Sequence, residues 1–237
     1  VVYENNVYFC AGIWPTDGVY LHALDAQTGK TLWSNGETGG MEMNQPHGGA
    51  RARSGVSAQG YLLANEKQIV VPTGRAVPAV FERSTGKFDY YHLQKNQKRG
   101  SSAAILVDEF IGNSGCLFNA VSGDLSAEVG GGQLVALPKG LMRSSGRQLI
   151  EYQFEDLSKV DRKGKPITLR KPTQKRQINM DREILSFIVA NIDAYCGEDG
   201  RVSAIDYTRQ QNTWWSHPVK GRALGLAASN GRLVVCT

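Results

Sequence analysis

The chain has 237 residues, of which 41% are hydrophobic and 27 are glycine, with a formal net charge of +5. This composition excludes a wholly disordered chain and favours short strands joined by tight turns, so the predicted class is all-β. No apolar stretch approaches the roughly 18 residues of a membrane-spanning helix. The N-terminus lacks the basic region followed by an apolar region that is typical of a secretory leader. Its first residues are already strand-like, so the sequence leaves open whether the protein is exported.

The first predicted hairpin is "VYLHALDAQTGKTLW", residues 19–33. Its strand ends on Ala23 and Asp25, a turn follows in which Gly29 takes a positive φ, and the second strand brings Trp33 against a neighbour. These positions form a template that can be moved along the rest of the chain.

A glycine-rich loop is predicted over residues 37–55, long enough to cover one face of the molecule. It gathers Met41, Met43, His47, Arg51 and Arg53. Met and His together suit copper, although the spacing matches no metal motif, and arginines beside glycine suit a phosphate or carboxylate. The competing interpretation is a mobile loop with incidental side chains. If a ligand binds anywhere, the predicted residues are His47, Arg51, Arg53 and Arg75, the last because it follows an apolar strand and is expected on the same face.

The template recurs three times, starting at residues 80, 117 and 204. The copies contain these matching positions: Glu82, Gly86 and Tyr90; Asn119 and Gly123, with Ala127 in place of the aromatic; and Asp206 and Trp214. The spacing predicts a further, degenerate unit between the last two copies, with its apolar strands in residues 132–157. The last residues, 223–237, are typical of the first two strands of one more unit.

A basic stretch, residues 159–176, follows the degenerate unit and holds a single Asp. Without interleaved aromatic residues it is predicted to be a solvated loop, and nucleic acid is not expected as a partner. It belongs to a predicted insertion over residues 157–182. The whole chain, 1–237, is predicted to form one domain.

The pattern "ALDAQTGKTLW" resembles the PQQ-like, quinoprotein-type β-propeller repeat, in which Trp33 and Trp214 take the tryptophan position. The resemblance implies a β-propeller of four-stranded antiparallel blades, about five of them present, as part of a six- to eight-bladed propeller. Free strand edges would then be covered by pairing of the terminal segments or by an edge-mediated dimer.

Enzymes of this family bind pyrroloquinoline quinone and calcium, and a pair of adjacent cysteines covers the quinone. Here Cys10, Cys116, Cys196 and Cys236 are far apart, and this spacing also excludes a zinc ribbon or a redox motif. Asn113, Asn119, Asp193 and Asp199 are explained more simply as turn residues than as calcium ligands.

The predicted function is therefore a non-catalytic binding or scaffold module, with no catalytic residue, metal or cofactor expected. Its partner would be a protein, peptide or polysaccharide on one propeller face. The module would belong to a larger exported or envelope-associated protein, while a cytoplasmic location stays open. The alternative is a dehydrogenase using pyrroloquinoline quinone with calcium, whose cofactor residues lie partly outside this chain. The paired tryptophans of "WWSHP" would favour sugar binding if Trp215 is exposed.

Overall fold

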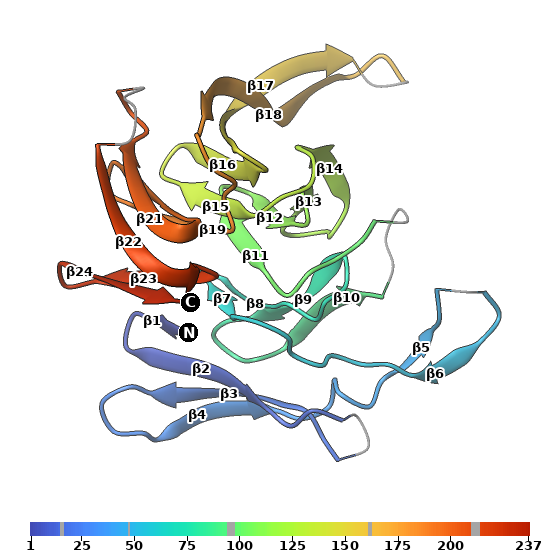
Figure 1. The fold of residues 1–237 in the computed structure, drawn as a ribbon. Coiled ribbons are helices and arrows are strands. Elements are labelled where there is room, and N and C mark those ends of the chain that lie inside the picture. The colour runs from blue at the N-terminus through green and yellow to red at the C-terminus, as the bar shows by residue number, and fades with distance from the viewer. Residues whose placement is uncertain (15–16, 47, 94–97, 161–162, 210–213) are drawn as a thin grey trace. The chain divides into compact units, whose positions relative to one another are not determined.

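The computed structural model describes residues 1–237 except 15–16, 47, 94–97, 161–162 and 210–213 (Figure 1). Every regular element among the described residues is a β-strand, numbered β1 to β24. None of these residues belongs to a helix that could cross a membrane. The chain divides into two compact units, Val1–Glu128 and Val129–Thr237, and each is described by itself.

The first unit contains three four-stranded antiparallel sheets whose neighbouring strands follow the chain order. Sheet 1 consists of β1 (Val2–Tyr3), β2 (Asn6–Ala11), β3 (Tyr20–Asp25) and β4 (Thr31–Asn35). Sheet 2 consists of β7 (Leu63–Ala64), β8 (Gln68–Val71), β9 (Val77–Glu82) and β10 (Phe88–His92). Sheet 3 consists of β11 (Ala104–Val107), β12 (Phe110–Asn113), β13 (Cys116–Asn119) and β14 (Leu125–Glu128). A small hairpin of β5 (Glu42–Asn44) and β6 (Arg51–Arg53) connects sheets 1 and 2.

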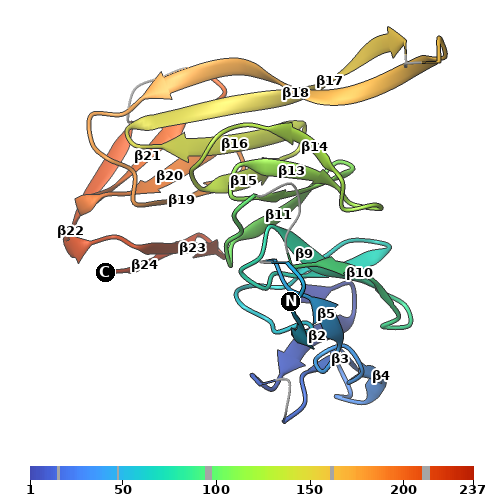
Figure 2. The same cartoon turned by 90° about the vertical axis from the view of Figure 1, so that its right-hand side faces the viewer.

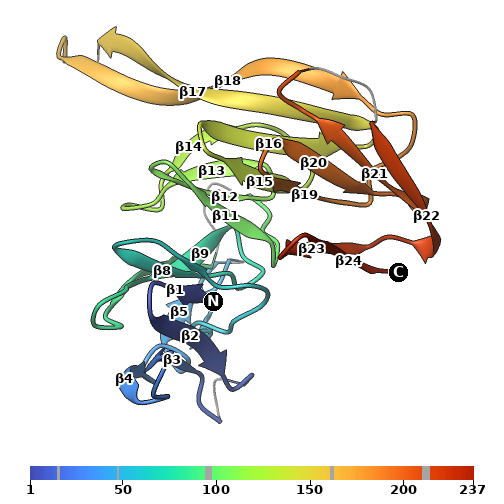
Figure 3. The same cartoon turned by 90° about the vertical axis from the view of Figure 1, so that its left-hand side faces the viewer.

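The second unit repeats this arrangement. Sheet 4 consists of β15 (Leu134–Leu137), β16 (Gly140–Ser145), β17 (Gln148–Val160) and β18 (Pro166–Asn179). Sheet 5 consists of β19 (Ser186–Ala190), β20 (Asp193–Gly197), β21 (Asp199–Asp206) and β22 (Trp215–Arg222). Sheet 6 has two strands, β23 (Gly225–Ser229) and β24 (Arg232–Cys236). The first strands of the three sheets are neighbours, because β19 contacts both β15 and β23 (Figure 3).

The core lies between successive sheets, so the middle strands are buried on both faces. In β9 every residue from Val77 to Phe81 is buried, which explains its continuous apolar run. Phe81 packs in one cluster with Tyr8 of sheet 1, while Val80 packs in another with Ile111 of sheet 3. Within the first unit, sheet 2 therefore packs against sheets 1 and 3 through opposite faces of β9.

The third strand of each repeat unit ends on a residue that accepts hydrogen bonds from the turn that follows. One carboxylate oxygen of Asp25 accepts from the Thr28 amide at 2.7 Å and from its hydroxyl at 2.8 Å. These bonds, the Thr28 amide first, hold the pKa of Asp25 below its ordinary value. Glu82 accepts the Thr85 hydroxyl at 2.7 Å, and Asn119 accepts the Ser122 amide at 3.1 Å. Asp206 likewise accepts the Thr208 hydroxyl at 2.6 Å.

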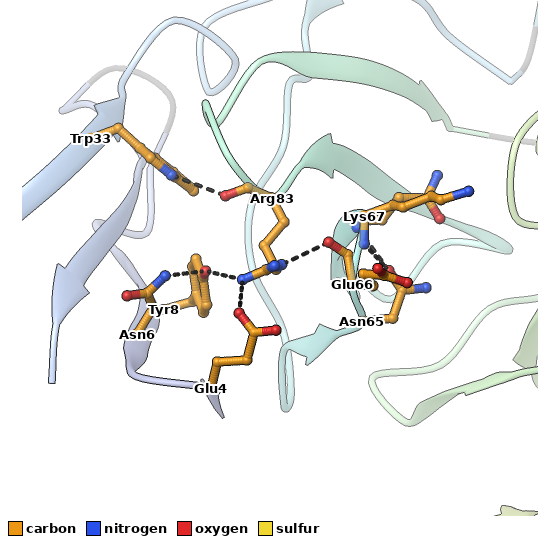
Figure 4. A network of polar contacts seen from close by, with 9 residues as sticks. Glu4, Asn6, Tyr8, Trp33, Asn65, Glu66, Lys67 and Arg83 are labelled. Atoms are coloured by element: carbon orange, nitrogen blue, oxygen red, sulfur yellow. Dashed lines mark hydrogen bonds and ion pairs between the residues drawn. The ribbon is translucent and has the colours of Figure 1, made fainter.

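The fourth strand of a sheet docks on the turn of the next sheet through a hydrogen bond to one particular carbonyl. The Trp33 indole donates to the Arg83 carbonyl at 3.0 Å (Figure 4), and the Tyr90 hydroxyl donates to the Ala120 carbonyl at 2.8 Å. Each acceptor directly follows the acidic or amide turn residue. Both rings also lie over the turn glycine, since a Cβ on Gly86 would come within 2.3 Å of Trp33.

In the degenerate unit, sheet 4, an arginine takes this role. The Arg176 guanidinium donates to the carbonyl of Tyr207, which directly follows Asp206, and to that of Thr208 at 2.9 Å. Its Nε lies 2.6 Å from the buried carboxylate of Glu151 on the neighbouring strand. A charged pair thus replaces the aromatic ring at this junction.

The docking position of sheet 5 differs from the sequence prediction. Strand pairing places Trp215 opposite Ala204, as it places Trp33 opposite Ala23, so Trp215 occupies the register position predicted for Trp214. The physical reason is that Ala204 and Trp215 are 11 positions apart in the chain, one more than Ala23 and Trp33. The Trp214 indole donates instead to the Asp193 carboxylate of its own sheet, at 3.0 Å.

Two segments predicted to be loops form hairpins. Most of the basic stretch, residues 159–176, lies in β18 and the end of β17, which pair through their whole lengths. Within sheet 4 these two strands run well beyond their neighbours (Figure 2). The predicted glycine-rich loop, residues 37–55, contains the β5–β6 hairpin. In both segments the backbone N–H and C=O groups pair in a two-stranded antiparallel ladder. This pairing outweighs the polar composition that favours a loop.

Candidate binding site

The β5–β6 hairpin presents two of the four predicted ligand-binding residues. Arg51 and Arg53 are exposed and lie opposite Asn44 and Glu42, so the two guanidinium groups share one face of the ribbon. Arg53 Nε lies 4.0 Å from the Glu42 carboxylate. His47, the third predicted residue, lies outside the described residues.

The other face of the hairpin is apolar. Met43, between the two pairs that carry the arginines, packs with Met41 against the core cluster of sheets 1 and 2. The two thioethers are therefore part of the core, which argues against the copper site considered from the sequence.

A hollow of about 490 Å³ lies between this hairpin and the end of β10. The residues that line it belong to two segments, Glu42–Pro46 and Tyr91–Leu93. Tyr91 is 7% exposed, and burial raises the pKa of its hydroxyl, while hydrogen bonds from Thr73 and Arg75 and the Arg75 charge act in the opposite direction. Arg75, the fourth predicted residue, contacts Tyr91 but does not itself line the hollow. Arg53 likewise lies beside the lining residue Glu42, outside the lining itself.

The loop that carries Arg75 is held in place by Asn113. The buried Asn113 amide donates to the carbonyls of Arg75 at 2.9 Å and Ala76 at 3.2 Å. Its oxygen accepts from both the amide and the hydroxyl of Ser101 at 3.0 Å. This side chain is fully engaged in fixing the loop, and its amide is not available as a calcium ligand.

The remaining calcium candidates are also engaged elsewhere or stand alone. Asn119 closes its turn, Asp193 accepts the Trp214 indole, and Asp199 is exposed at the start of β21. Across the described ranges no three His, Cys, Asp or Glu residues form a group able to hold a metal ion. The four cysteines are all unpaired. Asn113, Asn119 and Asp193 therefore already have hydrogen-bond partners within the fold.

A second hollow, of about 440 Å³, lies in the other unit between β22 and β24. Trp214 and Trp215 are 54% and 37% exposed, and Trp215 stacks on His217 with ring centroids 6.2 Å apart. Leu233 and Val235 of β24 complete its apolar wall. Trp215 is thus exposed, and an exposed Trp215 is what sugar binding by the paired tryptophans requires.

Two arginines important to the structure were not predicted. Arg83 donates to the Glu66 carbonyl at 2.9 Å, to Glu4 at 3.1 Å and to the Tyr8 hydroxyl at 3.3 Å (Figure 4). Its guanidinium also lies over the Tyr3 ring. Arg201 joins the fully buried Glu198 to Asp181. Their neighbours come from distant parts of the sequence or from ordinary turns, so no local motif indicates either arginine.

No protein-family model matches this chain, and no curated protein sequence matches it either. Solved structures do match. A computationally designed protein, Ika8, aligns over 99% of this chain and 66% of its own, with a TM-score of 0.59 and 13% identity. BamB from Moraxella catarrhalis aligns over 92% of this chain and 77% of its own, with a TM-score of 0.50 and 15% identity.

A europium-containing methanol dehydrogenase aligns over 94% of this chain and 61% of its own, with a TM-score of 0.53 and 12% identity. The chain thus spans about two thirds of the designed protein and less of the dehydrogenase. Identities this low report on the fold alone. With five four-stranded sheets and a sixth of two strands among the described residues, the chain has an all-β, β-propeller fold.

Proposed function

We propose that this chain is a non-catalytic binding module of a larger exported protein, and that the exposed face of the β5–β6 hairpin with Arg51 and Arg53, beside the hollow, takes an acidic ligand. The observation that carries the proposal is the placement of Arg51 and Arg53 on one face of a hairpin whose other face is fixed to the core by Met43. Arginine pairs carboxylates through two parallel hydrogen bonds, and a fixed ribbon limits the entropy lost on binding.

An acidic peptide and a polyuronate both offer this chemistry, so they are the ligand classes expected. Glu42 contributes one opposing charge, yet it lies beside Arg53 and orients that guanidinium. The rigid Arg75 loop adds a third cationic group beside Tyr91. A neutral polymer would gain nothing from these three charges.

The test is a titration of the full chain with poly-L-glutamate, polygalacturonate and neutral dextran, followed by calorimetry. Binding of either acidic polymer should weaken at least fivefold in Arg51→Gln/Arg53→Gln and in Arg75→Gln. The matched control is Arg147→Gln, an exposed arginine in the other unit. Unchanged affinity in the hollow variants would refute the proposed site.

The alternative function, a quinone-dependent dehydrogenase, is tested on the same protein with pyrroloquinoline quinone and calcium. Saturable, calcium-dependent binding together with dye-linked alcohol oxidation would overturn the non-catalytic proposal. An edge-mediated dimer is proposed as well, because β24 presents a free edge with Val234 64% exposed. Sedimentation velocity of the wild type and of Val234→Lys would show a dimer that the lysine dissociates.

A further inference from the structure

The outer halves of β17 and β18 form an arm that leaves its sheet. The pairing of β17 with β16 ends at Tyr152, whereas its pairing with β18 continues from Gln153 to Val160. Eight cross-strand pairs therefore extend beyond the last strand that supports them on the other side (Figure 2). A ribbon of only two strands is marginally stable in water, and a third strand would stabilise it.

The two edges of the arm differ. The outer edge, on β18, carries Pro166 and Pro172, and proline removes the donor that an added strand would need. The opposite edge, Gln153–Val160 of β17, contains no proline. Alternate residues of an antiparallel strand direct their N–H and C=O groups away from the partner, so this edge offers a ladder to a further strand.

Aliphatic side chains are exposed on both faces of the arm. Leu157 lies opposite Leu169 on one face and is 40% exposed, and Ile167 on the same face is 36% exposed. Val160, on the other face, is 67% exposed. An added strand that alternates apolar and polar residues would place its apolar side chains on one face, next to Leu157 or next to Val160 according to its register.

Charge favours an acidic partner. The described residues of the arm include five cationic side chains, Lys159, Lys163, Lys165, Arg170 and Lys171. Of the two carboxylates among these described residues, Asp156 accepts from Arg170 at 2.9 Å and Glu155 accepts from the Thr173 hydroxyl at 2.9 Å. Because the lysines gather toward the end of the arm, that end attracts negative charge.

We propose that the edge Gln153–Val160 of β17 binds an extended protein segment as an added strand, with acidic residues of that segment next to the lysines at the end of the arm. A lipid surface would meet the same charges, but it would leave the unpaired backbone groups of β17 without partners. The inference rests on the proposed binding role. Because the arm and the hairpin beside the hollow are different surfaces, a variant of one should leave ligand binding at the other unchanged, and the two proposals can be refuted independently.

The experiment selects a displayed library of random twelve-residue peptides on the full chain. Enriched peptides should alternate apolar and polar residues and carry Asp or Glu at the end that meets the arm's lysines. In fluorescence polarisation they should lose at least tenfold in affinity for Leu157→Lys/Val160→Lys. The matched control, Val121→Lys, changes a valine that is 79% exposed in the other unit and should bind normally. Hydrogen exchange should slow within residues 153–160 when peptide binds.

Four results would overturn the inference. The first is a selection that enriches no peptide over the unselected library. The second is a set of enriched peptides that bind the arm variant as tightly as the wild type. Binding of phosphatidylglycerol vesicles, lost in the arm variant while no peptide binds, would assign the arm to a lipid surface. A concentration-dependent dimer that the same variant abolishes would assign the edge to a second copy. Far-UV circular dichroism of each variant verifies that the sheets still form.

Discussion

The contact between Trp33 and Gly86 can be measured with two matched glycine substitutions. Gly29 and Gly86 hold the same place in their turns, with φ values of +70° and +71°. A Cβ on Gly29 meets nothing within 4 Å, whereas one on Gly86 comes within 2.3 Å of the Trp33 ring. Gly29→Ala therefore pays only for the left-handed backbone, about 1–2 kcal/mol. Gly86→Ala should lose another 1–3 kcal/mol or so from overpacking.

The assay is urea unfolding of the full chain, followed by far-UV circular dichroism, with free energies compared at a common slope. Gly123→Ala should fall between the two, because its Cβ would lie 2.9 Å from Tyr90. In a Trp33→Ala background the extra loss at Gly86 should vanish, leaving a coupling energy of about 1–3 kcal/mol. Equal losses at Gly29 and Gly86, or an extra loss that persists without the Trp33 ring, would refute the docking argument.

Three further predictions concern single side chains. Arg176→Met leaves the buried Glu151 carboxylate without its closest partner and should cost about 3–5 kcal/mol in urea unfolding; a loss under 1 kcal/mol would contradict the pairing. Since hydrogen bonds lower the pKa of Asp25 in the folded protein, its contribution is present at neutral pH and lost as the pH falls from about 5 through the ordinary aspartate value near 3.9 and below. In Asp25→Asn the free energy of unfolding should fall less steeply over this acidic pH range, and an unchanged pH dependence would refute the assignment. At pH 8 the exposed Cys236 should react with iodoacetamide within minutes, whereas burial raises the pKa of Cys196 to about 12 and should protect it until unfolding; mass spectrometry of the labelled peptides decides.

The repeat could be predicted from the sequence because the hydrogen bonds of its turn join residues only two or three positions apart. Asp25 bonds to amides two and three positions ahead, so the motif contains both donor and acceptor. The role of Arg176 could not be predicted, because an arginine shares no side-chain shape with Trp33 and its partners, the Tyr207 and Thr208 carbonyls and Glu151, are distant in the sequence. The register at Trp215 was missed for a simpler reason, a spacing one residue longer than the template allows.

The candidate site was predicted only in part. Composition drew attention to Arg51 and Arg53, but a polar, glycine-rich segment gives no sign that its methionines pack against a core. Over Pro166–Asn179 only Ile167 and Leu169 alternate clearly with polar residues, which is too short a run to predict a strand of this length. Charge was the misleading signal there, since long cationic side chains are compatible with a solvent-exposed ladder.

The acceptor in each docking contact belongs to the main chain. Arg83, Ala120 and Tyr207 have no side-chain property in common, yet each offers the same carbonyl to the neighbouring sheet. Mutation can alter every side chain at that position without removing the acceptor. Half of each junction is therefore protected from substitution, which allows sequences to diverge while the sheets keep their mutual arrangement. A fold shared with solved structures at 12–15% identity agrees with such protection.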